Sequence, residues 1–147
     1  SFLTKYFVSH LGALFVERFD TQQSIEDSRR LIQMLKGGRS VAVFPEGTFV
    51  RMPGLLPFRM GAFTAATKAR VPVVPVVLKG TRSTLRDGSW FPRRAALSVT
   101  ICPPIMVEGS DWSAAITMRN EVRQAMLDVS GEPDLTFETG MVERLRE

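Results

Sequence analysis

The chain has 147 residues, 44% of them hydrophobic, and carries 19 Lys and Arg against 15 Asp and Glu. This length suits a single domain, and the apolar share is large enough to fill a core, which excludes an intrinsically disordered chain. Cys102 is the sole cysteine and His10 the sole histidine, so an internal disulfide and a Cys/His zinc site are also excluded.

Apolar residues recur in short runs that predict strands alternating with helices. In chain order, we expect a helix over 2–11, a strand over 13–17, a helix over 22–36, a strand over 40–44, a helix over 61–70, strands over 73–79 and 97–102, and a helix over 111–129. Gly37 and Gly38 stop the second helix, alanines suit the third for close packing on a sheet, and Asp111 is the expected N-cap of the last. Nearly all-apolar strands that alternate with helices predict an α/β fold with a mainly parallel sheet flanked by helices.

The net charge of +4 is unevenly distributed along the chain. Residues 51–94 hold nine basic side chains and the single acid Asp87, whereas residues 131–147 hold five acids against Arg144 and Arg146. We therefore expect one domain over residues 1–130 and an acidic C-terminal tail over 131–147. The basic segment is either a solvated face or a surface for an anion, and that anion could be a phosphate-bearing small molecule, nucleic acid or acidic lipid.

A distinctive turn follows the strand predicted over 40–44. Pro45 ends the strand, Gly47 permits a tight turn, and Glu46 and Thr48 are offered at the strand terminus, where ligands of such sheets bind. Further along, Arg59 lies near the start of the next predicted helix, where anions are favoured.

Taken in order, these segments resemble the phospholipid/glycerol acyltransferase family of the 1-acylglycerol-3-phosphate acyltransferase type. The family motif Gly-x-x-Phe-Ile-Asp-Arg is matched by residues 12–18, Phe-Pro-Glu-Gly-Thr by 44–48, and Pro-Phe-Lys-x-Gly-Ala by 57–62. The family's Val-Pro strand motif is matched by residues 71–76, whose two prolines also predict an edge strand or a bulge, because each removes a ladder donor. The resemblance covers residues 12–105.

The resemblance implies an enzyme that transfers a fatty acyl group from acyl-CoA or acyl carrier protein to a hydroxyl of a lysophospholipid or glycerol-phosphate acceptor. It needs no cofactor besides the acyl donor and no metal. By position in the family motifs, the acceptor's phosphate would be bound by Arg18, Glu46, Gly47 and Thr48, with Arg59 as a supporting cation. Arginine forks match phosphate oxygens, and glycine lets the backbone approach them.

Two departures from the family pattern affect this expectation. The family's catalytic His-x-x-x-x-Asp motif precedes the residues matched here, and His10 is followed five residues later by Phe15, so we interpret His10 as non-catalytic. We therefore expect an N-terminally truncated domain, inactive by itself, or else a non-catalytic relative that binds lipid or anions. In addition, Phe49 and Val50 replace the family's Arg-Ser, which favours an acceptor other than the usual one.

The longest apolar run, residues 71–78, is too short to cross a bilayer. Because the implied acceptor is a lipid, we expect a cytoplasmic protein that contacts the inner face of a membrane peripherally. Nucleic-acid binding is the least favoured alternative, since only the basic pI of about 9.8 suggests it and no reading motif is recognisable.

Overall fold

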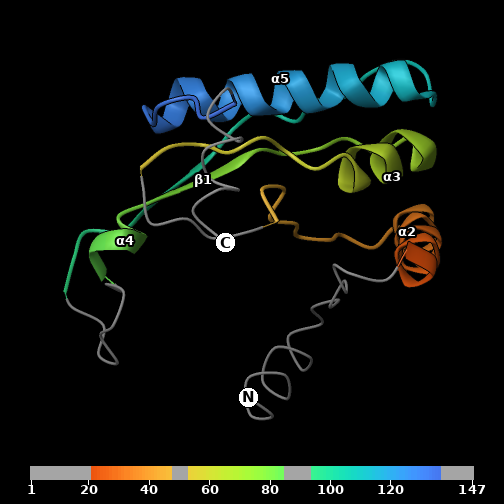
Figure 1. Ribbon diagram of the computed structural model, residues 1–147, viewed down its shortest axis with the longest axis horizontal. Coiled ribbons are helices and arrows are strands. Elements are labelled where there is room, and N and C mark those ends of the chain that lie inside the picture. The colour runs from red at the N-terminus through yellow and green to blue at the C-terminus, as the bar shows by residue number, and fades with distance from the viewer. Residues whose placement is uncertain (1–20, 48–52, 85–93, 137–147) are drawn as a thin grey trace, which may run out of the picture.

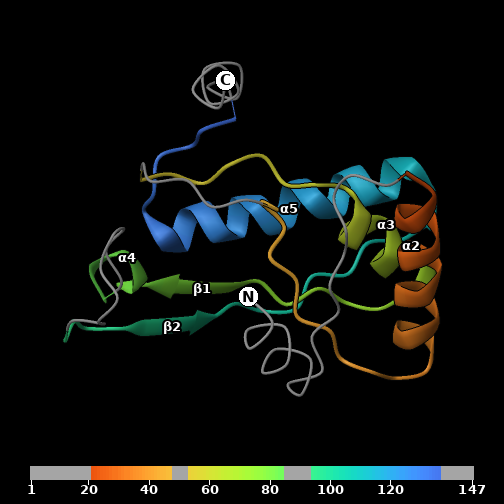
Figure 2. The same ribbon diagram turned by 60° about the horizontal axis from the view of Figure 1, so that its bottom comes forward.

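The computed structural model describes residues 21–47, 53–84 and 94–136, which form a set of packed helices beside a short strand pair (Figure 1). In chain order the elements are α2 (Thr21–Lys36), α3 (Gly61–Ala69), β1 (Val76–Lys79), α4 (Thr81–Thr84), β2 (Ser98–Ile101) and α5 (Trp112–Ser130). Helix α3 packs beside the N-terminal part of α5, and α2 stands against α3 at the same end of the molecule (Figure 2). The helix and strand predicted over 2–11 and 13–17 lie outside the described residues.

Helix α5 begins and ends where the sequence predicts. At its start, Oδ1 of Asp111 accepts a hydrogen bond from the N–H of Ala114 at 2.8 Å, which satisfies one of the free donors of the first turn. At its end, Gly131 adopts a left-handed conformation and its N–H donates to the carbonyl of Leu127 at 3.1 Å. The helices predicted over 22–36 and 61–70 are also confirmed, as α2 and α3, whereas the short α4 was not expected.

The inward face of α5 lies closer to its N-terminus than the apolar pattern indicates. Its buried residues are Ala114, Ala115, Met118 and Val122. Of the expected inward residues, Val122 is buried, while Ile116, Met126 and Val129 are only partly covered. The alanines allow close approach of α3, so the helix contact shifts towards the end where α3 packs.

Helix α3 packs between two helices, and the expected packing of this helix on a sheet is not seen among the described residues. It contacts α2 on one side and α5 on the other. Its buried residues Ala65 and Ala66 are small and leave room for both neighbours. The hydroxyl of buried Thr67 donates to the carbonyl of Phe63 at 3.0 Å, so this buried polar group is hydrogen-bonded.

The strand pair is antiparallel, with Val76 opposite Ile101 and Leu78 opposite Val99. The described residues combine helices with this antiparallel pair and two isolated bridges, so the expected mainly parallel sheet is not seen among them. The predicted strand over 73–79 is split, because Pro75 has no N–H and joins the ladder only through its carbonyl, which accepts from Cys102 at 2.9 Å. Whether the prolines mark an edge strand or a bulge stays a prediction. The expected burial of the two strands holds only for Pro75, Val77 and Cys102.

The predicted buried strand over 40–44 is wrong for the described structure. These residues form no regular element, and Phe44 is 74% exposed. A strand requires a neighbour for its N–H and C=O groups, and no strand among the described residues pairs with this segment.

The core lies where α3, α5 and the loop before α3 meet. Its buried cluster consists of Leu55, Phe58, Phe63, Ala66, Met118 and Val122. The rings of Phe58 and Phe63 are stacked, with centroids 6.0 Å apart. The loop residues are therefore anchored in the core, which fixes the position of the segment that follows them. None of the helices in the described part of the chain is both long enough and apolar enough to cross a membrane.

Candidate functional site

The chain turns sharply directly after Phe44. The N–H of Gly47 donates to the carbonyl of Phe44 at 3.2 Å, which closes the turn. Gly47 has a φ of +65°, a left-handed conformation that glycine adopts without the steric cost borne by other residues. The tight turn predicted at these residues is confirmed.

The carboxylate of Glu46 points back towards the loop that precedes α3. Its Oε2 accepts a hydrogen bond from the backbone N–H of Leu56 at 3.0 Å. Leu56 is only 4% exposed, so its N–H has little access to water and depends on this partner. Glu46 therefore ties the turn to the core-anchored loop.

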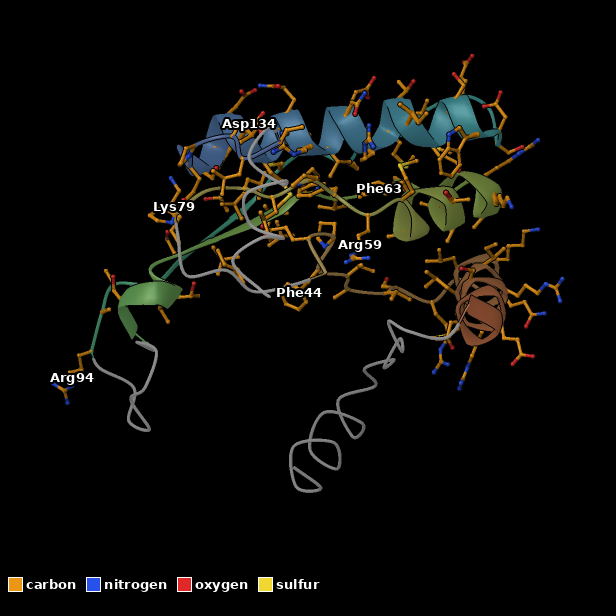
Figure 3. The ribbon with its side chains drawn as sticks, viewed as in Figure 1. Phe44, Arg59, Phe63, Lys79, Arg94 and Asp134 are labelled. Atoms are coloured by element: carbon orange, nitrogen blue, oxygen red, sulfur yellow. The ribbon has the colours of Figure 1, made fainter. Side chains whose placement is uncertain are left out.

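Arg59 is brought to the same turn from the loop directly before α3. Its N–H donates to the carbonyl of Pro45 at 2.8 Å. Its side chain lies directly over Gly47, since a Cβ placed on that glycine would be 2.5 Å from Nε of Arg59 (Figure 3). The Arg59 side chain is exposed, so its guanidinium can meet a ligand from solvent. An arginine fork beside a glycine turn suits a phosphate or carboxylate group.

Helix α5 holds the loop on its other side through Arg123. Its guanidinium donates to the carbonyls of Leu55 and Leu56 at 2.7 and 3.3 Å, and to the two carboxylate oxygens of Asp134 at 2.6 and 2.9 Å. The backbone of residues 133–135 also pairs with Leu55 through two hydrogen bonds, of 2.9 and 3.1 Å. The first part of the predicted acidic tail is thus packed against the loop, while the domain boundary at residue 130 stays a prediction.

The ion pair shifts the titration of Asp134. The Arg123 guanidinium, and then the hydroxyl and N–H of Thr136, hold the pKa of the Asp134 carboxyl well below its usual range. Since the folded pKa lies below the unfolded value of about 3.9, the pair stabilises the fold above that pH. This stabilisation is lost as the pH falls towards the folded pKa.

We expect Asp134→Asn to lower the free energy of unfolding at pH 7 by about 1 kcal/mol at most, because the carboxylate is 44% exposed and water screens the pair. The difference from the wild type should shrink as the pH falls below about 4. Urea unfolding at pH 7 and at pH 3 measures both quantities. Asp128→Asn is the control: this exposed carboxylate lies near the C-terminus of α5, where a negative charge is unfavourable, and the asparagine carbonyl can still accept the hydrogen bond that Gln124 donates to Asp128. Its loss of charge should therefore cost no stability. An unfolding difference for Asp134→Asn that persists unchanged at pH 3 would contradict the assignment.

The structure brings together Glu46, Gly47 and Arg59 among the predicted binding residues. Arg18 and Thr48 lie outside the described residues, as do His10 and the Phe49-Val50 departure, so their placement stays a prediction. Binding of an acceptor by Glu46, Gly47 or Arg59 also stays a prediction, but the geometry distinguishes them: Glu46 turns inwards to the backbone and Arg59 turns outwards.

Three described basic residues of the segment 51–94 lie apart from one another. Figure 3 shows Arg59 beside the turn, Lys79 at the far end of β1, and Arg94 further from the turn still. Lys79 and Arg94 are both exposed. The separation of these three favours the interpretation of Lys79 and Arg94 as solvated surface charges and leaves Arg59 as the cation nearest the turn among them.

Arg123 and the backbone of Leu56 contribute to the site, but the motifs did not predict either of them. Arg123 lies 67 residues from Leu56 in the chain, so no local spacing connects them. One feature of the sequence could have indicated a role for Arg123: it lies between Val122 and Met126, on the side of the helix that the apolar pattern turns inwards. A cation in such a position needs buried partners, although the pattern does not say which ones.

Comparison with known proteins agrees with this geometry. A family model described as Acyltransferase matches residues 2–79, which include the turn, Arg59 and α3. The chain belongs to the acyltransferase family. The resemblance drawn from the motifs is thereby confirmed.

Several relatives are similar to this chain over most of its length. A chloroplastic 1-acyl-sn-glycerol-3-phosphate acyltransferase of Brassica napus is 40% identical over 124 residues, covering 84% of this chain and 36% of the relative. The 1-acyl-sn-glycerol-3-phosphate acyltransferase of Saccharomyces cerevisiae is 30% identical over 130 residues, covering 86% of this chain and 43% of the relative. The chain therefore spans less than half the length of these relatives.

The fold also resembles a solved acyltransferase. The crystal structure of PlsC, the 1-acyl-sn-glycerophosphate acyltransferase of Thermotoga maritima, superposes with a TM-score of 0.66 and 25% sequence identity. The match covers 84% of this chain and 48% of PlsC. The described helices and strands are thus part of an acyltransferase fold.

Proposed function

We propose that this chain supplies the acceptor site of an O-acyltransferase, which transfers a fatty acyl group from acyl-CoA or acyl carrier protein to a hydroxyl of a lysophospholipid or glycerol-phosphate acceptor. Membership of the acyltransferase family supports the reaction class. The observation that carries the acceptor site is the exposed Arg59 fork held over the Gly47 turn. This arrangement fits the phosphate group that such acceptors share.

In the proposed site, Arg59 donates to the phosphate and Gly47 lets the ligand come close to the backbone. Glu46 has a structural role in this proposal, because a carboxylate repels a phosphate. Its carboxylate holds the turn in place by accepting a hydrogen bond from the N–H of Leu56. Arg18 and Thr48 join the site in this proposal as further donors. A phosphate fixed in this way would hold the acceptor hydroxyl in one orientation for the reaction.

In the transfer itself, the acceptor hydroxyl oxygen forms a bond to the thioester carbonyl carbon, and the carbon–sulfur bond breaks. The hydroxyl proton passes to a base and ends on the departing thiol, so the products are an ester and a free thiol. The described residues include no histidine, and we assign the base to none of them. The reaction needs no cofactor beyond the acyl donor.

The proposal extends to the sheet and to the membrane. We propose that β1 and β2 belong to a larger, mainly parallel sheet flanked by helices. Four exposed apolar residues of the pair lie on one face, and such a face needs a covering layer: Val76, Leu78, Val99 and Ile101. We also propose that the protein is cytoplasmic and contacts the inner face of a membrane peripherally. The lipid acceptor and the exposed Phe44 beside the turn support this location.

We expect Arg59→Gln to raise the KM for the acceptor about tenfold, because a hydrogen bond to a charged group contributes about 1.5–3 kcal/mol. The KM for the acyl donor should stay unchanged. Lys68→Gln is the control, since Lys68 is an exposed cation on α3, the helix that follows Arg59. Steady-state kinetics with glycerol 3-phosphate and lysophosphatidic acid as acceptors measures both constants in the full-length protein.

A rise in the donor KM alone would contradict the acceptor role of Arg59. Acceptor binding without any transfer in the wild type would identify a non-catalytic relative that binds lipid or anions instead.

A further inference from the structure

Arg123 is a cation that helix α5 places inside the molecule. Its side chain is only 12% exposed, and its guanidinium lies 5.8 Å from the centroid of the Phe58 ring. An apolar side chain of similar size often stabilises an interior as well as a buried ion pair does, so the ion pair with Asp134 alone does not account for arginine here. The remaining donors of Arg123 point to the main-chain carbonyls of Leu55 and Leu56.

Leu56 connects Arg123 directly to the candidate site. Its carbonyl accepts from Nε of Arg123 at 3.3 Å, and its N–H donates to Oε2 of Glu46 at 3.0 Å. Arg123 and Glu46 thus hold the two polar groups of a single buried residue. A shift of Leu56 towards or away from α5 would change the position of the Glu46 carboxylate, and with it the turn.

A second connection runs through Phe58. Its ring faces the Arg123 guanidinium and stacks on Phe63, and the next residue is Arg59. The N–H of Arg59 in turn donates to the carbonyl of Pro45 in the turn. Both connections begin at Arg123 and end at the turn.

We propose that Arg123 is a positioning residue of the acceptor site, which places Glu46 and Arg59 through Leu56 and Phe58 without touching the substrate. This inference rests on the proposed function. Loss of the guanidinium would let the loop over residues 55–58 relax and would separate Arg59 from the turn. The acceptor would bind more weakly, whereas the affinity for the acyl donor would stay unchanged.

The test compares Arg123→Met and the milder Arg123→Lys with Arg119→Met in the full-length protein. Arg119 is the matched control, because it lies one turn earlier on α5 and donates to its neighbour Asn120. We expect the acceptor KM to rise about tenfold in Arg123→Met and less in Arg123→Lys, with the donor KM unchanged. Amide hydrogen exchange at Leu56 should quicken about tenfold or more in Arg123→Met and stay at the wild-type rate in Arg119→Met.

Asp134→Asn separates positioning from stability, because it weakens the ion pair and leaves the loop carbonyls with their donors. Equal acceptor KM values in Asp134→Asn and Arg123→Lys at matched Tm would overturn the positioning role. The double variant Arg123→Lys/Glu46→Gln is a second test, since the two residues are inferred to act through the same Leu56. If its change in acceptor KM equals the product of the two single changes, the positioning role is overturned.

The hydrogen-exchange measurement keeps the two proposals distinguishable. Unchanged exchange at Leu56 in both Arg123 variants overturns the role of Arg123 alone, whatever the activity. Absence of both transfer and acceptor binding in the wild type overturns the proposed function, and with it the acceptor site that Arg123 is inferred to position.

Discussion

Glu46→Ala should lower kcat/KM for the acceptor about 100-fold, because it removes a charge-assisted hydrogen bond that organises the site, an effect of about 2.7 kcal/mol. The carboxylate of Glu46 binds the N–H of Leu56, and Leu56 is buried. Without the carboxylate that N–H has no comparable partner, so the turn and the loop would separate. The fold should survive, with the free energy of unfolding lowered by about 1–3 kcal/mol.

Glu46→Gln separates the hydrogen bond of Glu46 from its charge. The glutamine carbonyl can still accept from Leu56, but more weakly than a carboxylate. We therefore expect this variant to lose about tenfold in kcat/KM, intermediate between the wild type and Glu46→Ala. Acceptor kinetics and urea unfolding on the same samples measure both effects. Wild-type kinetics in Glu46→Ala would remove Glu46 from the site, and equal losses in the two variants would show that its charge, and not its hydrogen bond, is what matters.

The helices could be predicted from the sequence because their signals are local. The limits of α5 follow from the side chain of Asp111 at one end and the left-handed Gly131 at the other, and both act within a few residues. The turn at Gly47 was predictable for the same reason. The short α4 after Gly80 carries no apolar period, and it was missed.

The strands were less predictable because a strand depends on its partner. The apolar run over 40–44 has the composition of a buried strand, yet no described strand pairs with it. The run over 73–79 does pair, but with an antiparallel neighbour reached through 18 residues of chain between β1 and β2, a direction that composition does not specify. Pro75 signalled the interruption in the ladder, since the missing N–H is a property of the residue itself.

The candidate site also has a part that local sequence predicts and a part that depends on distant contacts. Motif residues that are close in sequence, Glu46 and Gly47, could be identified together, and Arg59 followed from its own motif. The link between them through Leu56 and Arg123 is a set of backbone contacts to a distant helix. A backbone carbonyl leaves no trace in the amino-acid sequence, because every residue has one. Only the folded chain shows that α5 supports the turn.

Gly47→Ala should also reduce acceptor use strongly, by about tenfold in kcat/KM. An alanine Cβ would lie 2.5 Å from Nε of Arg59, which is too close, so the arginine side chain must move off the turn. Because a flexible side chain can move more easily than backbone, the structural cost should be limited to about 1–2 kcal/mol for a left-handed alanine. The functional cost would be the loss of the Arg59 fork from the site.

Gly131→Ala is the matched control for this change. Gly131 has the same φ of +65°, but a Cβ there would meet no atom within 4 Å. Both variants should therefore lose similar stability in urea, while only Gly47→Ala loses acceptor kcat/KM. In the Gly47→Ala background, adding Arg59→Gln should cause little further loss, since the fork has already left the site. A full additional tenfold loss in the double variant would mean that Arg59 still binds the acceptor when an alanine occupies the turn, and that Gly47 matters for a reason other than the place of Arg59.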